Sequence, residues 1–273
     1  MRVTDLSLDR IAAATTVIDP VFRDTPQYVD EQLCARLGRP VLVKAEILNP
    51  LRSFKGRGAD FLVSGLAPGS TVVCSSTGGN FGQAVGYAAR RRGLRAEVFV
   101  AADTSPVKLA RMTALGAHVH PVDDDPKARA EEHAGRGHGR VLAVDGRDAA
   151  IAEGAGTIGV ELLRTGGIDT VVLPVGDGAL VTGVARWIRT HAPSVRVVGV
   201  AAAAAPALVH SWRSGSVCTV ERRNTFAAGI SIRRPEPEAV ERTRELVDDM
   251  VLVEDAELVA AMQVAASTLG PDS

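Results

Sequence analysis

The sequence has little cysteine, few aromatic residues and almost no net charge. Its three cysteines are scattered over 273 residues without a Cys-x-x-Cys pair, so they indicate neither a disulfide framework nor a cysteine metal site. Aromatic residues make up 4% of the chain and the net charge is -1. Few rings are therefore available to stack on bases, and no overall field attracts nucleic acid or an anionic membrane.

Long apolar runs are also absent. The alanine run at 201–205 is too short to cross a bilayer, and the N-terminus carries Asp5 and Asp9 where a signal peptide would have an apolar core. We therefore predict a soluble cytoplasmic protein with no nucleic-acid or membrane partner.

What is present is an alternation of short β-branched runs with longer helical stretches. Strands are expected at 41–45, 71–75, 96–101, 118–122, 140–144, 170–175, 196–201 and 250–253. Helices are expected at 54–66, 80–92, 105–115, 126–134, 154–165, 179–191, 205–213, 236–247 and 255–269. This order predicts βαβ units around largely parallel sheets. The continuously apolar runs 171–175 and 197–200 are typical of strands buried on both faces.

The predicted fold class is α/β, with two open, twisted, mainly parallel sheets flanked by helices. No long linker interrupts the chain, so we expect the smaller domain to be inserted in the larger one. The predicted large, cofactor-binding domain comprises residues 1–74 and 148–273. The predicted small domain, 75–147, carries the substrate loop.

Lys55 is the first candidate functional residue, in the run Ser53-Phe54-Lys55-Gly56-Arg57-Gly58. A lysine after an aromatic residue and among glycines can begin a helix with its amine facing a cavity. Most lysines are solvated surface groups, so this run alone does not establish a site.

Two glycine-bearing loops lie downstream, each between an apolar strand and a helix. The run Ser76-Thr77-Gly78-Gly79-Asn80-Phe81 suits an anion such as a carboxylate, because exposed amides gather at a helix start. An ordinary capped turn would have the same pattern.

The other loop, Gly176-Asp177-Gly178-Ala179-Leu180, suits a phosphate on backbone amides. Val181 stands where a dinucleotide fingerprint needs its third glycine, so an NAD-binding oxidoreductase is disfavoured. The Asp177 carboxylate would repel a phosphate unless its side chain turns away. His118 and His120 have the spacing of metal ligands on one strand face, but no third ligand is near in sequence, so we predict no metal site.

Together these blocks resemble the fold type II pyridoxal-phosphate enzymes, the tryptophan synthase β superfamily, and within it the threonine/serine dehydratase group. The resemblance runs from about Thr25 to the C-terminus. It is carried, in order, by 53–59, 77–83, 105–108 with 114–117, 154–158, 176–183 and 225–230.

The resemblance implies roles for these residues. Lys55 would form the Schiff base with pyridoxal 5'-phosphate, Phe54 would pack beside the pyridine ring, and Asn80 would hydrogen-bond its 3′ oxygen. Amides of Gly176, Asp177, Gly178, Ala179 and Leu180 would bind the phosphate. The substrate carboxylate would lie on Ser76, Thr77, Gly78, Gly79 and Phe81. A lysine pKa of about 10.4 would fall toward roughly 7–8 on burial beside the cofactor, so the freed amine could take the α-proton.

The chain departs from the dehydratase pattern at several positions. Phe81 replaces a usual histidine, and Asp177 and Ala179 replace glycines. Ala201 and Ala228 stand where acidic residues are common. The chain stops at Ser273, before the segment that carries the partner of the pyridine nitrogen. Either the chain is a fragment or shortened variant, or another group serves.

The implied activity is a lyase reaction: α,β-elimination on a small β-hydroxy or β-amino amino acid, giving a 2-keto acid and ammonia. A β-replacement synthase of the same fold and a catalytically impaired cofactor-binding member are the alternatives. The resemblance also implies a homodimer.

Overall fold

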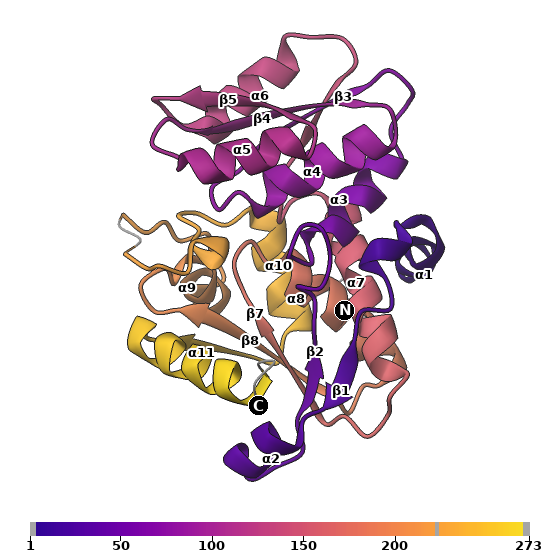
Figure 1. The fold of residues 1–273 in the computed structure, drawn as a ribbon, viewed down its shortest axis with the longest axis vertical. Coiled ribbons are helices and arrows are strands. Elements are labelled where there is room, and N and C mark those ends of the chain that lie inside the picture. Colours follow the sequence, from indigo (N-terminus) through magenta and orange to yellow (C-terminus); the bar gives the residue numbers. More distant parts are fainter. Residues whose placement is uncertain (1–3, 222–223, 270–273) are drawn as a thin grey trace.

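The computed structural model describes residues 4–221 and 224–269. It contains two parallel sheets, one above the other, with helices around each (Figure 1). The upper sheet has the strand order β5-β4-β3-β6 and the lower sheet has the order β7-β8-β9. The predicted α/β class with two mainly parallel sheets is therefore confirmed.

The four-stranded sheet is built from one continuous stretch of chain. Its strands are β3 (Thr71–Ser75), β4 (Arg95–Ala101), β5 (Ala117–Val122) and β6 (Arg140–Ala143), and the connecting helices are α4 (Asn80–Arg91), α5 (Pro106–Ala114) and α6 (Pro126–Gly135). All three pairings are parallel. The predicted boundary at 74/75 would cut through β3, which pairs with β4 and β6, so a division before Thr71 fits the pairing better. The division into two domains itself stays a prediction.

The three-stranded sheet contains β7 (Thr170–Pro174), β8 (Arg196–Ala202) and β9 (Asp249–Val253). The helices of this half are α7 (Ala149–Leu163), α8 (Ala179–His191), α9 (Ala207–Ser214), α10 (Pro237–Leu246) and α11 (Asp255–Leu269), with a short 3-10 turn, η2 (Ala228–Ile230). Burial on both faces was the wrong prediction for β7. Its residues alternate, and Val172 is 63% exposed because β7 is an edge strand with one uncovered face.

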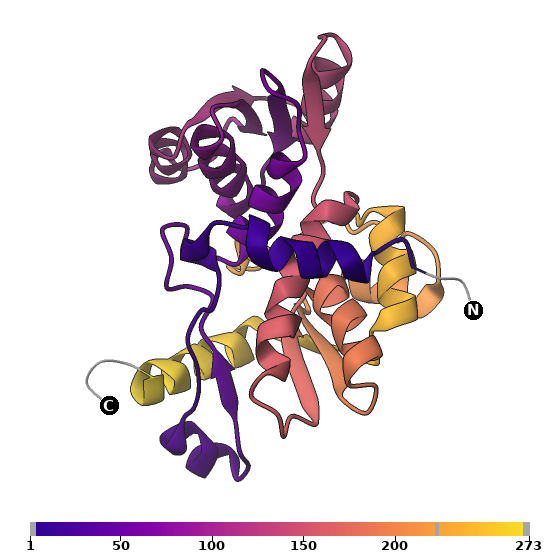
Figure 2. The same cartoon turned by 90° about the vertical axis from the view of Figure 1, so that its right-hand side faces the viewer.

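The N-terminal part contains the predicted strand at 41–45 as β2 (Leu42–Lys44), and it adds elements that were not predicted. These are α1 (Leu8–Val17), the 3-10 turn η1 (Pro20–Phe22), β1 (Gln27–Val29), which pairs with β2 in a two-stranded antiparallel ribbon, and α2 (Glu31–Leu37) between the two strands. Figure 2 shows α1, in indigo, lying across the middle of the molecule. Helix α7 also begins at Ala149, five residues before the predicted start at Gly154.

Helix α3 (Lys55–Ser64) is held against α7, and α7 against α8, by close backbone approach. A Cβ added to Gly58 would lie 2.5 Å from the carbonyl oxygen of Ile151, and one added to Gly183 would lie 1.9 Å from that of Ala152. Larger residues would force these helices apart. The glycines thus bring the N-terminus of α3 toward that of α8.

No helix among the described residues combines the length and the apolar character needed to cross a membrane.

Candidate active site

Lys55 begins α3 and its side chain is buried. Its Nζ pairs with Asp145 Oδ2 and lies 3.5 Å from Asp177 Oδ2. The same amine lies 5.0 Å from the centre of the Phe54 ring. Residues 55 and 177, which the sequence placed in separate loops, are thus brought together.

The charge state of Lys55 follows from these neighbours. Burial by itself would lower the pKa of the amine, but the Asp145 and Asp177 carboxylates outweigh it and raise the pKa above its ordinary value. The predicted fall toward 7–8 concerned Lys55 beside the cofactor and stays a prediction. In the protein alone, two adjacent acids that sequence reasoning did not anticipate raise the pKa of Lys55. In this state Lys55 is an ammonium ion.

Backbone contacts fix the start of α3. The Ser53 hydroxyl accepts a hydrogen bond from the Lys55 backbone amide at 3.2 Å. A Cβ on Gly56 would lie 2.5 Å from the Phe22 ring. The glycine after the lysine thus lets the start of α3 pack against Phe22.

Asp145 is the functional candidate that sequence reasoning missed. It lies in the turn between β6 and α7, its side chain is 9% exposed, and its Oδ1 is buried without a hydrogen-bond partner. Burial raises the pKa of Asp145 to about 6, although the Lys55 ammonium opposes the shift. The sequence signal was an acidic residue directly after a predicted strand, where ligands of parallel sheets gather.

The Asp145 turn is held in place by the surrounding chain. The backbone amide of Val144 donates to Asp148 Oδ2 at 2.6 Å, and the Arg242 guanidinium donates to the carbonyl oxygens of Gly146 and Arg147. A Cβ on Gly146, whose φ is +85°, would lie 2.7 Å from the Asp177 carbonyl oxygen. The two loops that carry Asp145 and Asp177 are therefore in direct backbone contact.

The predicted phosphate loop lies at the N-terminus of α8. Gly178 is the N-cap with φ +95°, and it has no side chain to cap the first-turn amides. A Cβ on Gly176 would lie 2.9 Å from Ile230 Cα. Amides at this uncapped helix start can receive an anion, and glycines allow the backbone to approach it.

The predicted substrate loop lies at the N-terminus of α4, where Gly79 is the N-cap with φ +90°. Ser76 is buried and its hydroxyl accepts from the Gly82 amide at 3.1 Å, so this oxygen caps the helix. Thr77 is exposed, whereas the Phe81 ring is buried in the core. These contacts make Thr77 the freer hydroxyl of the loop.

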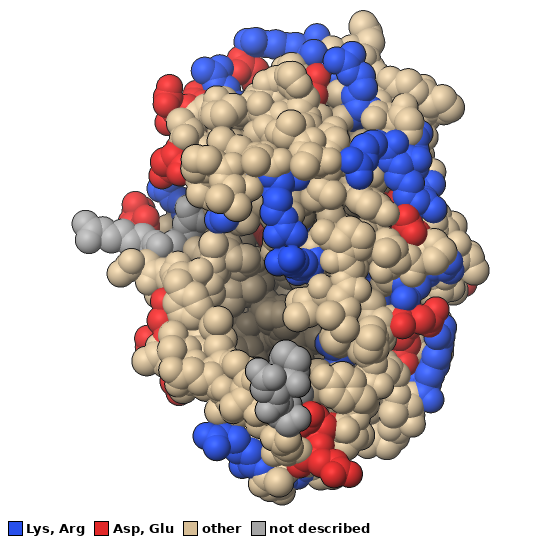
Figure 3. All heavy atoms as spheres, in the orientation of Figure 1, with Lys and Arg blue, Asp and Glu red and all other residues tan. Residues whose placement is uncertain are grey.

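The turn η2 contacts both the predicted phosphate loop and the predicted substrate loop. A Cβ on Gly78 would lie 3.0 Å from the Ala228 carbonyl oxygen, while Gly176 abuts Ile230. A Cβ on Gly229 would lie 3.8 Å from Asn80 Nδ2. The loops at 76–81 and 176–180 thus lie on either side of residues 228–230. The space-filling view shows a hollow between the two halves of the molecule, with lysine and arginine side chains at its rim (Figure 3).

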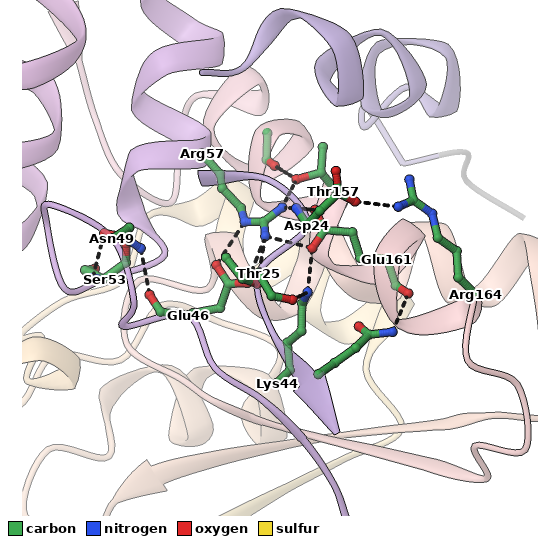
Figure 4. A network of polar contacts seen from close by, with 12 residues as sticks. Asp24, Thr25, Lys44, Glu46, Asn49, Ser53, Arg57, Thr157, Glu161 and Arg164 are labelled. Carbon is green, nitrogen blue, oxygen red and sulfur yellow. Dashed lines mark hydrogen bonds and ion pairs between the residues drawn. The ribbon is translucent and has the colours of Figure 1, made fainter. Parts of the chain in front are cut away.

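A buried ionic network lies around Arg57, two residues after Lys55 on α3. The Arg57 guanidinium is 0% exposed and pairs with Glu46 and Glu161 (Figure 4). Lys44 Nζ also reaches Glu161, at 2.5 Å. A cavity of about 270 Å³ borders Lys44 and Glu161 on this side. Because every charge in the network is already paired, we assign it to the structural support of α3 and not to the chemistry.

The two histidines singled out in the sequence lie on one face of the four-stranded sheet. Their ring centres are 4.8 Å apart, and His133 from α6 and Glu97 from β4 join them. The described residues nevertheless include no group of three or more such side chains arranged to hold a metal ion.

The residues present fit pyridoxal phosphate. A buried amine, an uncapped helix start lined by glycines, and an amide side chain at Asn80 occur on three converging elements. The Asp177 carboxylate, which would oppose a phosphate, is directed to the Lys55 amine.

Comparisons with known proteins agree with this geometry. The chain belongs to the family described as pyridoxal-phosphate dependent enzyme, which it matches over residues 18–271. It is 34% identical to the L-threonine ammonia-lyase of Geobacter sulfurreducens over 237 residues, 83% of this chain and 58% of that protein. It is 31% identical to the biosynthetic L-threonine dehydratase of Pasteurella multocida over 258 residues, 92% of this chain and 50% of that one. The chain spans about half the length of the curated relatives it matches.

Solved structures show the same fold. The threonine deaminase of T.th. superposes with a TM-score of 0.88 at 30% identity, covering 96% of this chain and 87% of that one. Maize serine racemase gives a TM-score of 0.88 at 27% identity, covering 97% and 82%. The predicted family and its pyridoxal-phosphate cofactor are confirmed.

Proposed function

We propose that this chain is a pyridoxal-phosphate-dependent lyase that catalyses α,β-elimination on a small β-hydroxy or β-amino amino acid, releasing a 2-keto acid and ammonia. The observation that carries the proposal is the buried Lys55 amine at the start of α3, facing the loop that opens α8. Relatives named threonine dehydratase and threonine ammonia-lyase support the reaction class.

The cofactor, when bound, supplies the electron sink that makes the α-proton of an amino acid acidic. In this proposal Lys55 holds the cofactor covalently, and amides of Gly176, Asp177, Gly178, Ala179 and Leu180 bind its phosphate. Phe54 packs beside its ring and Asn80 donates to its 3′ oxygen.

Residues of the 76–81 loop bind the substrate carboxylate. Amides of Gly78, Gly79 and Phe81 and the exposed Thr77 hydroxyl make these contacts, and Ser76 holds the loop through its bond to Gly82. Lys55 Nζ, as the free amine, takes the proton from Cα. The β-substituent then leaves with its electron pair.

The cofactor test is spectroscopic. Protein mixed with pyridoxal phosphate is expected to develop a visible absorption band, and borohydride is expected to fix the label on the peptide that contains Lys55. Lys55→Ala is expected to lose the label, while Lys127→Ala, at an ion pair with Glu236, keeps it. A label on another lysine would contradict the assignment.

The reaction test measures keto acid and ammonia released from threonine, serine and 2,3-diaminopropionate. Keto acid from at least one of them, absent in Lys55→Ala, is expected. A thioether amino acid formed from serine and an added thiol, with no keto acid, would instead identify a β-replacement synthase.

The proposal also covers the oligomeric state and the cellular location of the protein. A homodimer follows from the family resemblance and is checked by light scattering during size-exclusion chromatography. A cytoplasmic location agrees with three free cysteines among the described residues, and is checked by fractionation of cells that express the tagged chain.

A further inference from the structure

Two carboxylates share one ammonium ion at the centre of the site. Asp145 and Asp177 both pair with Lys55, and no other lysine or arginine of the described residues forms an ion pair with either. Asp145 Oδ1 is buried and has no hydrogen-bond partner. The group therefore carries one more negative charge than positive, and one of its oxygens is left to receive a donor.

The excess of negative charge increases when Lys55 takes part in the reaction. Its Nζ can react with an aldehyde or accept a proton only as the free amine, and in that form it no longer balances either carboxylate. A cofactor phosphate adds further negative charge at the nearby start of α8. The Asp145 side chain is 9% exposed, whereas that of Asp177 is 32% exposed. A buried carboxylate without a cation is costly, so Asp145 in the working site favours a positive group from elsewhere.

The two carboxylates are held where a substrate can supply that group. Backbone contact between Gly146 and Asp177 fixes the Asp145 and Asp177 loops against each other, and both loops follow strand ends. We propose that Asp145 and Asp177 bind a cationic β-substituent, so that the site takes a β-amino amino acid such as 2,3-diaminopropionate in preference to serine or threonine. This inference rests on the proposed function.

The reaction balances for this substrate. The Cα–H bond breaks with its proton passing to Lys55, and its electron pair forms the Cα=Cβ bond. The Cβ–N bond breaks, and the nitrogen leaves as ammonia with the bonding pair. Water then hydrolyses the released 2-aminoacrylate to the 2-keto acid and a second ammonia. Two ammonia molecules per keto acid distinguish it from serine, which gives one.

A first experiment tests the carboxylate pair without cofactor. In Lys55→Ala the two acids lose their ammonium ion, and added ethylammonium chloride is expected to replace it. We expect a saturable rise in Tm on the order of 2–4 °C above that given by equal sodium chloride. In Lys55→Ala/Asp145→Asn, ethylammonium chloride is expected to raise Tm no more than sodium chloride does. The same is expected of the wild type, because its own Lys55 amine already pairs with Asp145 and Asp177. Equal shifts in the single and double variants, or none in either, would overturn the proposal.

A second experiment uses the cofactor-loaded protein. The kcat/KM for diaminopropionate is expected to exceed that for serine at least tenfold. Asp145→Asn and Asp177→Asn are each expected to reduce this ratio at least tenfold, while Asp103→Asn, at an exposed site, leaves it unchanged. A ratio that the variants do not alter would overturn the proposal.

The two experiments separate the two claims. Keto acid from serine and threonine, with no ethylammonium effect, rejects the cation-binding pair and leaves the lyase function standing. An ethylammonium effect that requires Asp145, with no keto acid from any substrate, rejects the lyase function and leaves the cation-binding pair standing.

Discussion

Arg57 donates to both carboxylate oxygens of Glu161, at 2.6 Å and 2.9 Å, in the interior of the protein. The same guanidinium donates to Glu46 and to the hydroxyls of Thr25 and Thr157. One side chain thus ties α3 to α7 and to the segment after β2. Because Lys55 lies on the same helix two residues earlier, this network supports the position of the Lys55 amine.

Replacing Arg57 by methionine is expected to lower the free energy of unfolding by about 3–5 kcal/mol, because Glu46 would lose its cation and Glu161 would keep only Lys44. Urea unfolding measures the change. Arg129→Met, at an exposed ion pair, is expected to change it by less than about 0.5 kcal/mol. Arg57→Met/Glu161→Met should be less destabilised than Arg57→Met. If the double variant is less stable than Arg57→Met, the carboxylates left without Arg57 do not cause the loss of stability.

The same network predicts a pH dependence. Burial opposes ionisation of Glu161, but hydrogen bonds and charge from Arg57, with Lys44, outweigh it and lower the pKa of Glu161 below its usual 4.5. Its stabilising contribution is therefore complete above pH 4.5 and is lost as the pH falls through the folded-state pKa. Urea unfolding from pH 7 to pH 3 should show a steeper acid loss in the wild type than in Glu161→Gln. An equal dependence of unfolding free energy on pH in the wild type and Glu161→Gln would contradict this role of Glu161. Glu132→Gln, at an exposed site, is the control and should behave as the wild type does.

Asp145 is expected to control how readily Lys55 accepts the cofactor. Its carboxylate helps raise the pKa of Lys55, so little free amine is present at neutral pH. Asp145→Asn should shift the pH profile of cofactor loading to lower pH, with loading at pH 7 faster by about tenfold for each pKa unit lost. Growth of the visible band after mixing measures the rate. Asp145→Glu keeps the charge and should keep the wild-type profile; a wild-type profile in Asp145→Asn would refute the assignment.

Gly176→Ala is expected to weaken cofactor binding at least tenfold. Its Cβ would lie 2.9 Å from Ile230 Cα, so the phosphate loop or η2 must move. Spectroscopic titration with pyridoxal phosphate gives the dissociation constant. Gly135→Ala, where a Cβ meets nothing within 4 Å, should bind as the wild type does. Unchanged binding in Gly176→Ala would show that this close approach is not needed.

Local patterns predicted most of the regular structure. All eight expected strands occur, because each is a short apolar run between turn residues, and α8 and α11 have the predicted bounds. The missed elements were weakly marked: β1 is three residues long, and α2 has seven residues of which none is buried. Helix α1 did have a signal, since Ser7 caps it and Ile11 and Ala14 share its buried face.

The sequence by itself determined the family, and it predicted Lys55 and the two loops at 76–81 and 176–180 as site candidates, because glycines, a helix start and a preceding strand are adjacent in the chain and leave a local pattern. Only the tertiary structure decided the charge around Lys55. Asp145 is 90 residues away in sequence, and it reaches the amine only when the turn after β6 packs against the start of α8. The pKa of a buried group depends on neighbours in space, so the direction of the Lys55 shift required the fold.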